Sequence, residues 1–150
     1  MGQIMNVKVE GKGTGMRTDA VAGKHTIAID EPESFGGKDS AIDPLSAFLA
    51  SLIACENVMA QLISNEMKFD LQGISFEVDG SLDLAGLMGD LSVKPYFQNV
   101  IVKAYLETSE SEERILELQK AVDKRCPVFR TLKDAGIPIE NHWVKAEVTV

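Results

Sequence analysis

Two cysteines, Cys55 and Cys126, are the residues of this chain most able to do redox chemistry. Cys55 lies near the middle of an apolar stretch, where a free cysteine is often only a small buried hydrophobic residue. Cys126 precedes Pro127, a residue that tolerates the first position of a helix. Because the backbone N–H groups and dipole of a helix N-terminus favour an anion, we expect a thiolate to be better tolerated at Cys126 than at Cys55.

A metal site is a second chemistry that these residue types could support. Cys55, Cys126, His25 and His142 are all ligand-type residues. They show no paired spacing such as Cys-x-x-Cys, and both histidines lie in alternating, strand-like segments. We therefore expect no metal and no organic cofactor.

Length, composition and charge limit the classes of protein. With 150 residues, 45% of them hydrophobic, the chain predicts a single globular domain over residues 1–150. A net charge of -8 and a pI near 4.7 argue against a nucleic-acid or anionic-membrane partner, because both bind basic patches. The N-terminus lacks a signal-peptide pattern, which predicts a cytoplasmic protein whose cysteines are thiols rather than a structural disulfide.

The element that must position Cys55 is a long helix predicted over residues 43–65. Asp43 can cap free backbone N–H groups, and Pro44 suits the first helical position. Within residues 44–55 only two serines are polar, so we expect this half to be buried all round. The uninterrupted apolar run is far shorter than the ~20 residues that a bilayer requires, and Glu56 and Asn57 interrupt it. It is therefore expected to be a core helix.

The remaining segments predict strands and two further helices. Alternating apolar and polar residues favour strands at 3–10, 25–30, 69–79, 97–106 and 142–150, with a glycine-rich turn after the first. Ser109 and Glu112 form a capping-box pattern before a helix whose apolar stripe is Ile115, Leu118 and Val122. A short helix should then run from Pro127 to a stop near Gly136. This succession indicates an α+β fold.

Several motifs, in their order along the chain, resemble a known family. They are Gly15-Met16-Arg17, the Pro44-led helix with Cys55 eleven residues later, Leu82-Asp-Leu-Ala-Gly-Leu87, Phe97-Gln-Asn-Val-Ile101 and Cys126-Pro127-Val128. This pattern resembles the osmotically inducible protein C (OsmC) and organic hydroperoxide resistance (Ohr) family over nearly the whole chain. The resemblance implies an intertwined homodimer in which antiparallel or mixed sheets wrap two long central helices.

The resemblance also implies a thiol peroxidase that acts on organic hydroperoxides. Cys55 would be the peroxidatic cysteine, Cys126 the resolving cysteine, and Arg17 the arginine that pairs with the reactive thiolate. Physical chemistry is consistent with this role for Arg17, since a guanidinium ~4 Å from a thiolate supplies up to ~4 kcal/mol at an effective dielectric constant of ~20. Burial alone would disfavour the thiolate.

One feature departs from the family pattern. Relatives carry a glutamate one or two residues after the helix proline, where it holds the arginine, and this chain has Leu45 and Ser46 there. Asp43, Glu31 and Glu56 are candidate substitutes. Glu56 directly follows Cys55, so its side chain points about 100° away around the helix.

Two hypotheses follow from the cysteines and the resemblance. In the first, Cys55 thiolate reduces an organic hydroperoxide and becomes a sulfenic acid, Cys126 condenses with it to a disulfide, and a dithiol reductant restores both thiols. In the second, favoured by the missing glutamate, the protein is non-catalytic and binds a small apolar or thiol-reactive ligand at the dimer interface beside Cys55.

Overall fold

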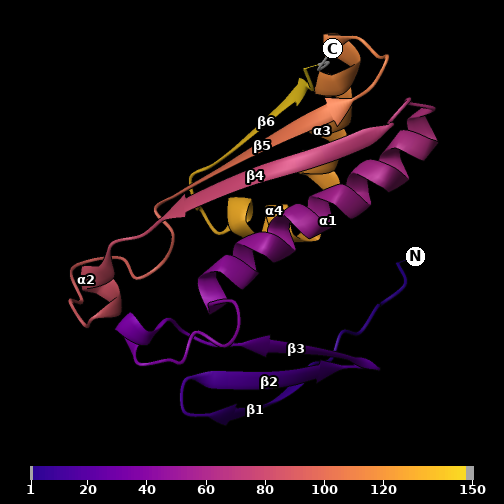
Figure 1. Ribbon diagram of the computed structural model, residues 1–150. Helices are drawn as coiled ribbons and strands as arrows, with labels where there is room; N and C mark the ends of the chain where they lie inside the picture. Colours follow the sequence, from indigo (N-terminus) through magenta and orange to yellow (C-terminus); the bar gives the residue numbers. More distant parts are fainter. Residues whose placement is uncertain (1, 148–150) are drawn as a thin grey trace. The chain divides into compact units, whose positions relative to one another are not determined.

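The computed structural model describes residues 2–147 and divides into two compact units, one within Met1–Phe48 and one within Leu49–Val150 (Figure 1). The first is built on a sheet of its own, and the second holds another sheet and most of the helices. The predicted α+β class is confirmed: the described residues form four α-helices and two three-stranded sheets.

The first unit is an antiparallel meander of β1 (Glu10–Thr14), β2 (Arg17–Ala22) and β3 (His25–Ile29), followed by a short 3-10 helix, η1 (Glu33–Phe35). The meander was predicted, but its first strand was misplaced, because only Glu10 of residues 3–10 is in a strand. Of the glycine-rich run expected to be a turn, Gly11 and Gly13 lie in β1, whereas Gly15 lies in the turn between β1 and β2, as predicted. Gly11 pairs with Ala20 in this sheet.

The sheet of the second unit is mixed. β4 (Gly73–Ser81) pairs antiparallel with β5 (Asn99–Glu107), and β5 pairs in parallel with β6 (Ile139–Lys145) (Figure 1). A short helix, α2 (Leu84–Leu87), lies between β4 and β5 in the sequence. The strands at 69–79 and 97–106 are therefore confirmed with shifted ends. The last strand begins at Ile139, before the predicted start, and residues 148–150 of that prediction lie outside the described residues.

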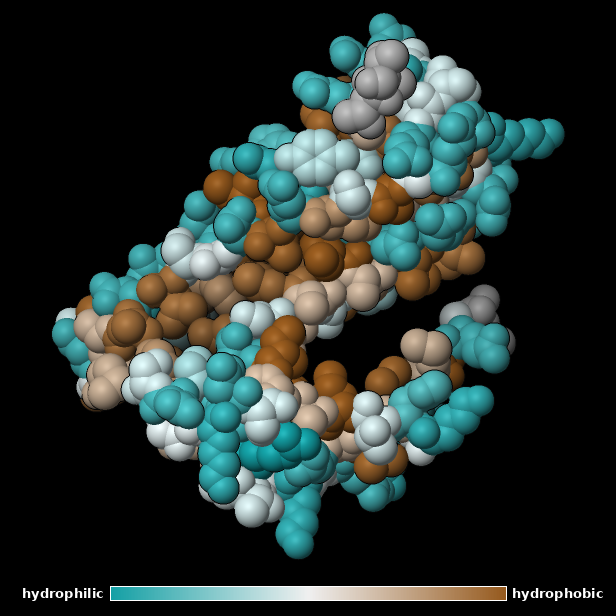
Figure 2. Space-filling model, in the orientation of Figure 1, coloured by the Kyte–Doolittle hydropathy of each residue, from teal (hydrophilic) through white to brown (hydrophobic). Residues whose placement is uncertain are grey.

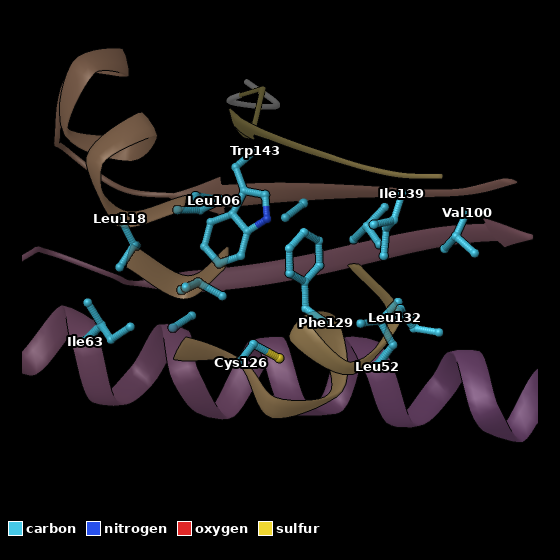
Figure 3. Close-up of a cluster of buried hydrophobic side chains, with 14 of the residues drawn as sticks. Leu52, Ile63, Val100, Leu106, Leu118, Cys126, Phe129, Leu132, Ile139 and Trp143 are labelled. Carbon is cyan, nitrogen blue, oxygen red and sulfur yellow. The ribbon is translucent and has the colours of Figure 1, made fainter. Parts of the chain in front are cut away.

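Three helices of the second unit cover one face of this sheet: α1 (Pro44–Met67), which starts in the first unit, α3 (Glu112–Arg125) and α4 (Pro127–Asp134). Along β5 the buried side chains alternate with more exposed ones, as expected for a sheet covered on one face. The core lies between this face and the helices, and Figure 3 shows Trp143 of β6, Phe129 of α4 and Leu118 of α3 directed into it.

The start of α3 differs from the prediction. The N-cap is Ser111, whose Oγ accepts a hydrogen bond from the backbone N–H of Arg114 at 3.2 Å. Ser109 instead donates its hydroxyl to Asp70 at 2.6 Å, so it is not free to cap the helix. The predicted stripe of Ile115, Leu118 and Val122 is fully buried, as expected.

The prediction that the first half of α1 is buried all round is wrong for the single chain. The buried side chains of α1 form one stripe, namely Leu52, Glu56, Ala60, Ile63 and Ser64, whereas Leu45 is 41% exposed. Figure 2 shows hydrophobic surface on the part of the second unit that carries α1 and β4. By length and composition alone, the 24 residues of α1 could cross a membrane, contrary to the sequence estimate. Its stripe packs into the core of the second unit, which identifies α1 as a core helix.

Candidate active site around Cys55 and Cys126

The structure brings the two cysteines together although they are far apart in the sequence. Cys55 lies near the middle of α1 and is half-buried, whereas Cys126 is fully buried and joins α3 to α4. Figure 3 shows Cys126 beside α1, between Leu52 and Ile63 along the helix. Cys55 packs against the core cluster that contains Cys126, and both cysteines are free thiols.

The expectation that Cys126 would carry the thiolate more readily is wrong. Burial raises the pKa of the Cys126 thiol to about 12, and the neighbouring Cys55 and Glu56 act in the same direction. Only the backbone N–H of Phe129, in the first turn of α4, opposes this shift. The helix terminus therefore supplies one favourable contact, and burial outweighs it. Cys126 is therefore protonated at neutral pH.

Glu56, the residue after Cys55, lies in the buried stripe of α1 rather than on its polar side. Its side chain is 0% exposed. One carboxylate oxygen, Oε1, accepts a hydrogen bond from the Asn141 side chain, while Oε2 is buried with no hydrogen-bond partner among the described residues. Burial raises the pKa of Glu56 to about 7, Asn141 opposes this rise, and the charge of Asp123 adds to it.

Asn141 connects Glu56 to a second carboxyl group and to the single tryptophan. It lies in β6, on the same face as Ile139 and Trp143, and its Nδ2 also donates to Asp123 Oδ1 at 2.6 Å. Its Oδ1 accepts a hydrogen bond from Trp143 Nε1 at 2.8 Å. The pKa of Asp123 is likewise raised, mainly by burial. The sequence analysis missed this network, because nothing in the sequence pairs Asn141 with a residue 85 positions earlier.

Arg17 is held in the first unit by two polar side chains. Its Nη2 contacts Asp19 Oδ1 at 2.9 Å and its Nη1 donates to Ser40 Oγ at 2.7 Å. The Ser40 hydroxyl in turn donates to Asp30 at 2.6 Å, and this bond is the main cause that lowers the pKa of Asp30 to about 2. Arg17, Asp30 and Ser40 line a cavity of about 270 Å³, together with Lys38.

Among the described residues, the side-chain bonds of Arg17 go to Asp19 and Ser40, and not to Glu31, Asp43 or Glu56, the proposed substitutes for the family glutamate. The Asp43 carboxylate caps α1 by accepting the backbone N–H of Ser46 at 2.9 Å, and Glu56 is bonded to Asn141 in the second unit. The carboxylate on Arg17 is Asp19, two residues along β2. Residues two apart in a strand share a face, so the Arg17-x-Asp19 spacing could have identified this pair.

The described residues, 2–147, contain no group of three or more His, Cys, Asp and Glu side chains placed to hold a metal ion. His142 lies on β6 with its Nε2 3.0 Å from Glu140, and His25 begins β3. The structure therefore does not bring the two histidines and two cysteines together as one ligand set.

Comparisons with known proteins agree with this architecture. The family model described as OsmC-like protein matches residues 37–141. No curated protein matches the chain.

Three solved structures similar to the chain carry related names. The OsmC-like protein from Mycoplasma pneumoniae has 20% sequence identity and a TM-score of 0.85, with 97% of this chain and 100% of that chain covered. An organic hydroperoxide resistance protein OsmC from Legionella pneumophila has 17% identity, a TM-score of 0.71 and the same coverage. An organic hydroperoxide resistance protein from Elizabethkingia anophelis has 15% identity and a TM-score of 0.73, with 99% and 100% covered. Since the family model spans more than half of the sequence, the chain belongs to the OsmC-like protein family.

Proposed function

We propose that this protein is a cysteine-based thiol peroxidase that reduces organic hydroperoxides. The observation that carries the proposal is the proximity of the two cysteines: Cys126 lies beside α1, and Cys55 of that helix packs against the core cluster that contains Cys126. A peroxidatic cysteine must be a thiolate, and a resolving cysteine must lie within bonding reach of it. Two solved structures named for organic hydroperoxide resistance share the fold.

In the proposed reaction, the Cys55 thiolate attacks the hydroperoxide O–O bond. One oxygen transfers to sulfur as a sulfenic acid, and the other leaves as an alkoxide that takes a proton to become the alcohol. The Cys126 sulfur then attacks the Cys55 sulfur, a disulfide forms and water leaves. A dithiol reductant, expected in the cytoplasm, restores both thiols and is itself oxidised.

Arg17 is the proposed cation for the Cys55 thiolate. Asp19 and Ser40 fix its guanidinium from two sides, which lowers the cost of ordering it in the reaction. The pairing with Asp19 supports a catalytic arginine even though Leu45 and Ser46 replace the family glutamate.

A homodimer is part of the same proposal. Val58 and Leu62, four residues apart on one face of α1, are 55% and 51% exposed in the single chain, as are other apolar residues of this helix. An apolar helix face of this kind is stabilised when another chain covers it. In the intertwined dimer that the family resemblance implies, the second copy covers α1.

A second candidate function is binding of a small apolar or thiol-reactive ligand without turnover. A groove of about 400 Å³ between α1 and β4 favours it, because most of its lining is apolar and Ala54 of that lining directly precedes Cys55. The apolar lining residues are Ala50, Ile53, Ala54, Ile74 and Phe76, and the polar ones are Asn57 and Ser75. This groove lies within the second unit. The loss of the family glutamate is consistent with such a role.

Peroxidase kinetics of cysteine variants decide between the two functions. With cumene hydroperoxide and excess dithiothreitol, Cys55→Ser should abolish turnover. Cys126→Ser should retain part of it, because an external thiol can resolve the Cys55 sulfenic acid. An active Cys55→Ser variant with an inactive Cys126→Ser variant would reverse the roles. A folded wild-type protein with no turnover of any organic hydroperoxide would refute the peroxidase and favour ligand binding.

A further inference from the structure

A buried carboxyl group, that of Glu56, directly follows Cys55 in the sequence and has no role in the peroxidase reaction described above. Glu56 is fully buried on α1, and its Oε2 atom is an acceptor with no hydrogen-bond donor among residues 2–147. Such an atom costs free energy, because desolvation is not repaid by a hydrogen bond. A hydrophobic residue at this position would continue the apolar stripe of Leu52, Ala60 and Ile63.

The groups that face Glu56 leave its proton exchangeable. Asn141 of β6 donates to both Glu56 and Asp123 of α3, so one amide group serves two carboxyl groups. The positive charges of Lys133 and Arg130 on α4 act to lower the pKa of Asp123. No cation is among the causes that shift the pKa of Glu56, which burial brings to about 7. Glu56 therefore exchanges its proton near neutral pH.

Cys126 needs a nearby base that can accept its proton. Its thiol is fully buried with a pKa of about 12, so very little Cys126 thiolate is present at pH 7. Attack on Cys55 requires the thiolate, and a positioned base can supply it during the attack. The titratable groups that act on Cys126 are Cys55, which is the target of the attack, and Glu56. Figure 3 shows Cys126 beside α1 between Leu52 and Ile63, and Glu56 belongs to the buried stripe of that same stretch of helix. The charge of Glu56 accordingly opposes ionisation of Cys126.

We propose that Glu56 is the base that accepts the Cys126 proton when Cys126 attacks oxidised Cys55. The Cys126 S–H bond breaks, its proton passes to the Glu56 carboxylate, and its sulfur forms a bond to the Cys55 sulfur. The group bound to Cys55 leaves with the electron pair of the broken bond. When that group is the hydroxyl of a sulfenic acid, it takes the proton back from Glu56 and departs as water. The physiological step rests on the proposed function, but the proton transfer can be tested without a hydroperoxide.

The test forms a mixed disulfide at Cys55 with dithiobis-nitrobenzoate and follows the second release of the coloured thionitrobenzoate anion. The first release reports modification of the half-buried Cys55. The second reports attack by Cys126 on the mixed disulfide, and the control Cys126→Ser should show only the first. In the wild-type protein the second rate should rise with pH, with an inflection near 7 as Glu56 loses its proton.

Glu56→Gln keeps the side-chain size and removes the base. We expect its second release to be about 100-fold slower at pH 8, without the inflection near 7, and to rise steadily toward higher pH as free Cys126 thiolate forms. Glu56→Asp, which retains a carboxylate, should keep an inflection. In Asp123→Asn the inflection should move to lower pH, because a negative charge that raises the Glu56 pKa is removed.

Four outcomes would overturn the proposal: a wild-type protein with no second release, a wild-type profile with no inflection near pH 7, a Glu56→Gln variant as fast as wild type, or one slowed equally at every pH. The wild-type profile decides the matter even where a variant does not fold. An expected pH profile in a protein that turns over no hydroperoxide would refute the peroxidase and support the proton transfer.

Discussion

The buried Glu56 carboxyl group should make the stability of this protein fall as pH rises through neutrality. Its pKa rises from 4.5 to about 7 on folding, mainly through burial. Between these values the unfolded chain has released a proton that the folded chain still holds, so the unfolding free energy decreases with pH. The stability associated with neutral Glu56 is fully present below pH 4.5 and is lost as pH rises through about 7.

The expected size of the effect is about 3 kcal/mol, since each pKa unit corresponds to ~1.4 kcal/mol. Carboxylates with lowered pKa values act in the opposite direction and in a lower pH range. Asp30, with a pKa of about 2, loses its contribution only as pH falls from near 4 toward 2. The interval from pH 5 to pH 8 therefore isolates Glu56, with a smaller contribution of the same sign from Asp123.

Urea unfolding at fixed protein concentration, followed by the fluorescence of the single tryptophan, measures this change. Trp143 is a suitable probe because it is buried and its Nε1 is bonded to Asn141 of the same network. Wild type should lose about 3 kcal/mol of unfolding free energy from pH 5 to pH 8, whereas Glu56→Gln should lose little. Asp123→Asn is the matched control and should retain most of the loss. Parallel pH profiles for wild type and Glu56→Gln would refute the reasoning.

Two further predictions concern the dimer and the arginine. Sedimentation should report a dimer at micromolar concentration, since a second copy is expected to cover the exposed apolar residues of α1; a stable monomer would contradict this. Asp19→Asn should lower the second-order rate with an organic hydroperoxide by up to about fivefold, the amount expected for a partly exposed ion pair. Leu45→Glu should raise the rate only in the Asp19→Asn background, where Arg17 lacks its carboxylate, and an equal gain in wild type would show that Asp19 does not hold Arg17 for catalysis.

Local patterns predicted most of the secondary structure because each depends on near neighbours. Alternation located β4 and β5, and the spacing of Ile115, Leu118 and Val122 located the buried face of α3. The errors occurred where a distant partner decided the outcome. Ser109 satisfies the capping pattern, yet Asp70 binds its hydroxyl and Ser111 caps the helix instead.

The candidate site was predictable to different degrees. The proximity of Cys55 and Cys126 came from the family resemblance, because nothing in the local sequence relates two cysteines on different elements. The Arg17–Asp19 pair was accessible from strand periodicity alone. The role of Glu56 was not accessible, since its polarity suggested the solvent side of α1, whereas its partner Asn141 lies on the buried face of β6.

Glu56 occupies a core position on α1 at which an apolar side chain would be expected. Burial of this group costs about 3 kcal/mol at pH 8, which is a large part of the stability of an ordinary domain. A leucine or methionine at the same place would avoid the unpartnered Oε2 atom and extend the core between α1 and the sheet. Packing therefore gives no reason for a glutamate between Leu52 and Ala60. A buried thiol that must lose a proton does give one, because the same burial that makes Cys126 a poor acid brings the Glu56 pKa into the range in which a carboxylate is an effective base at neutral pH.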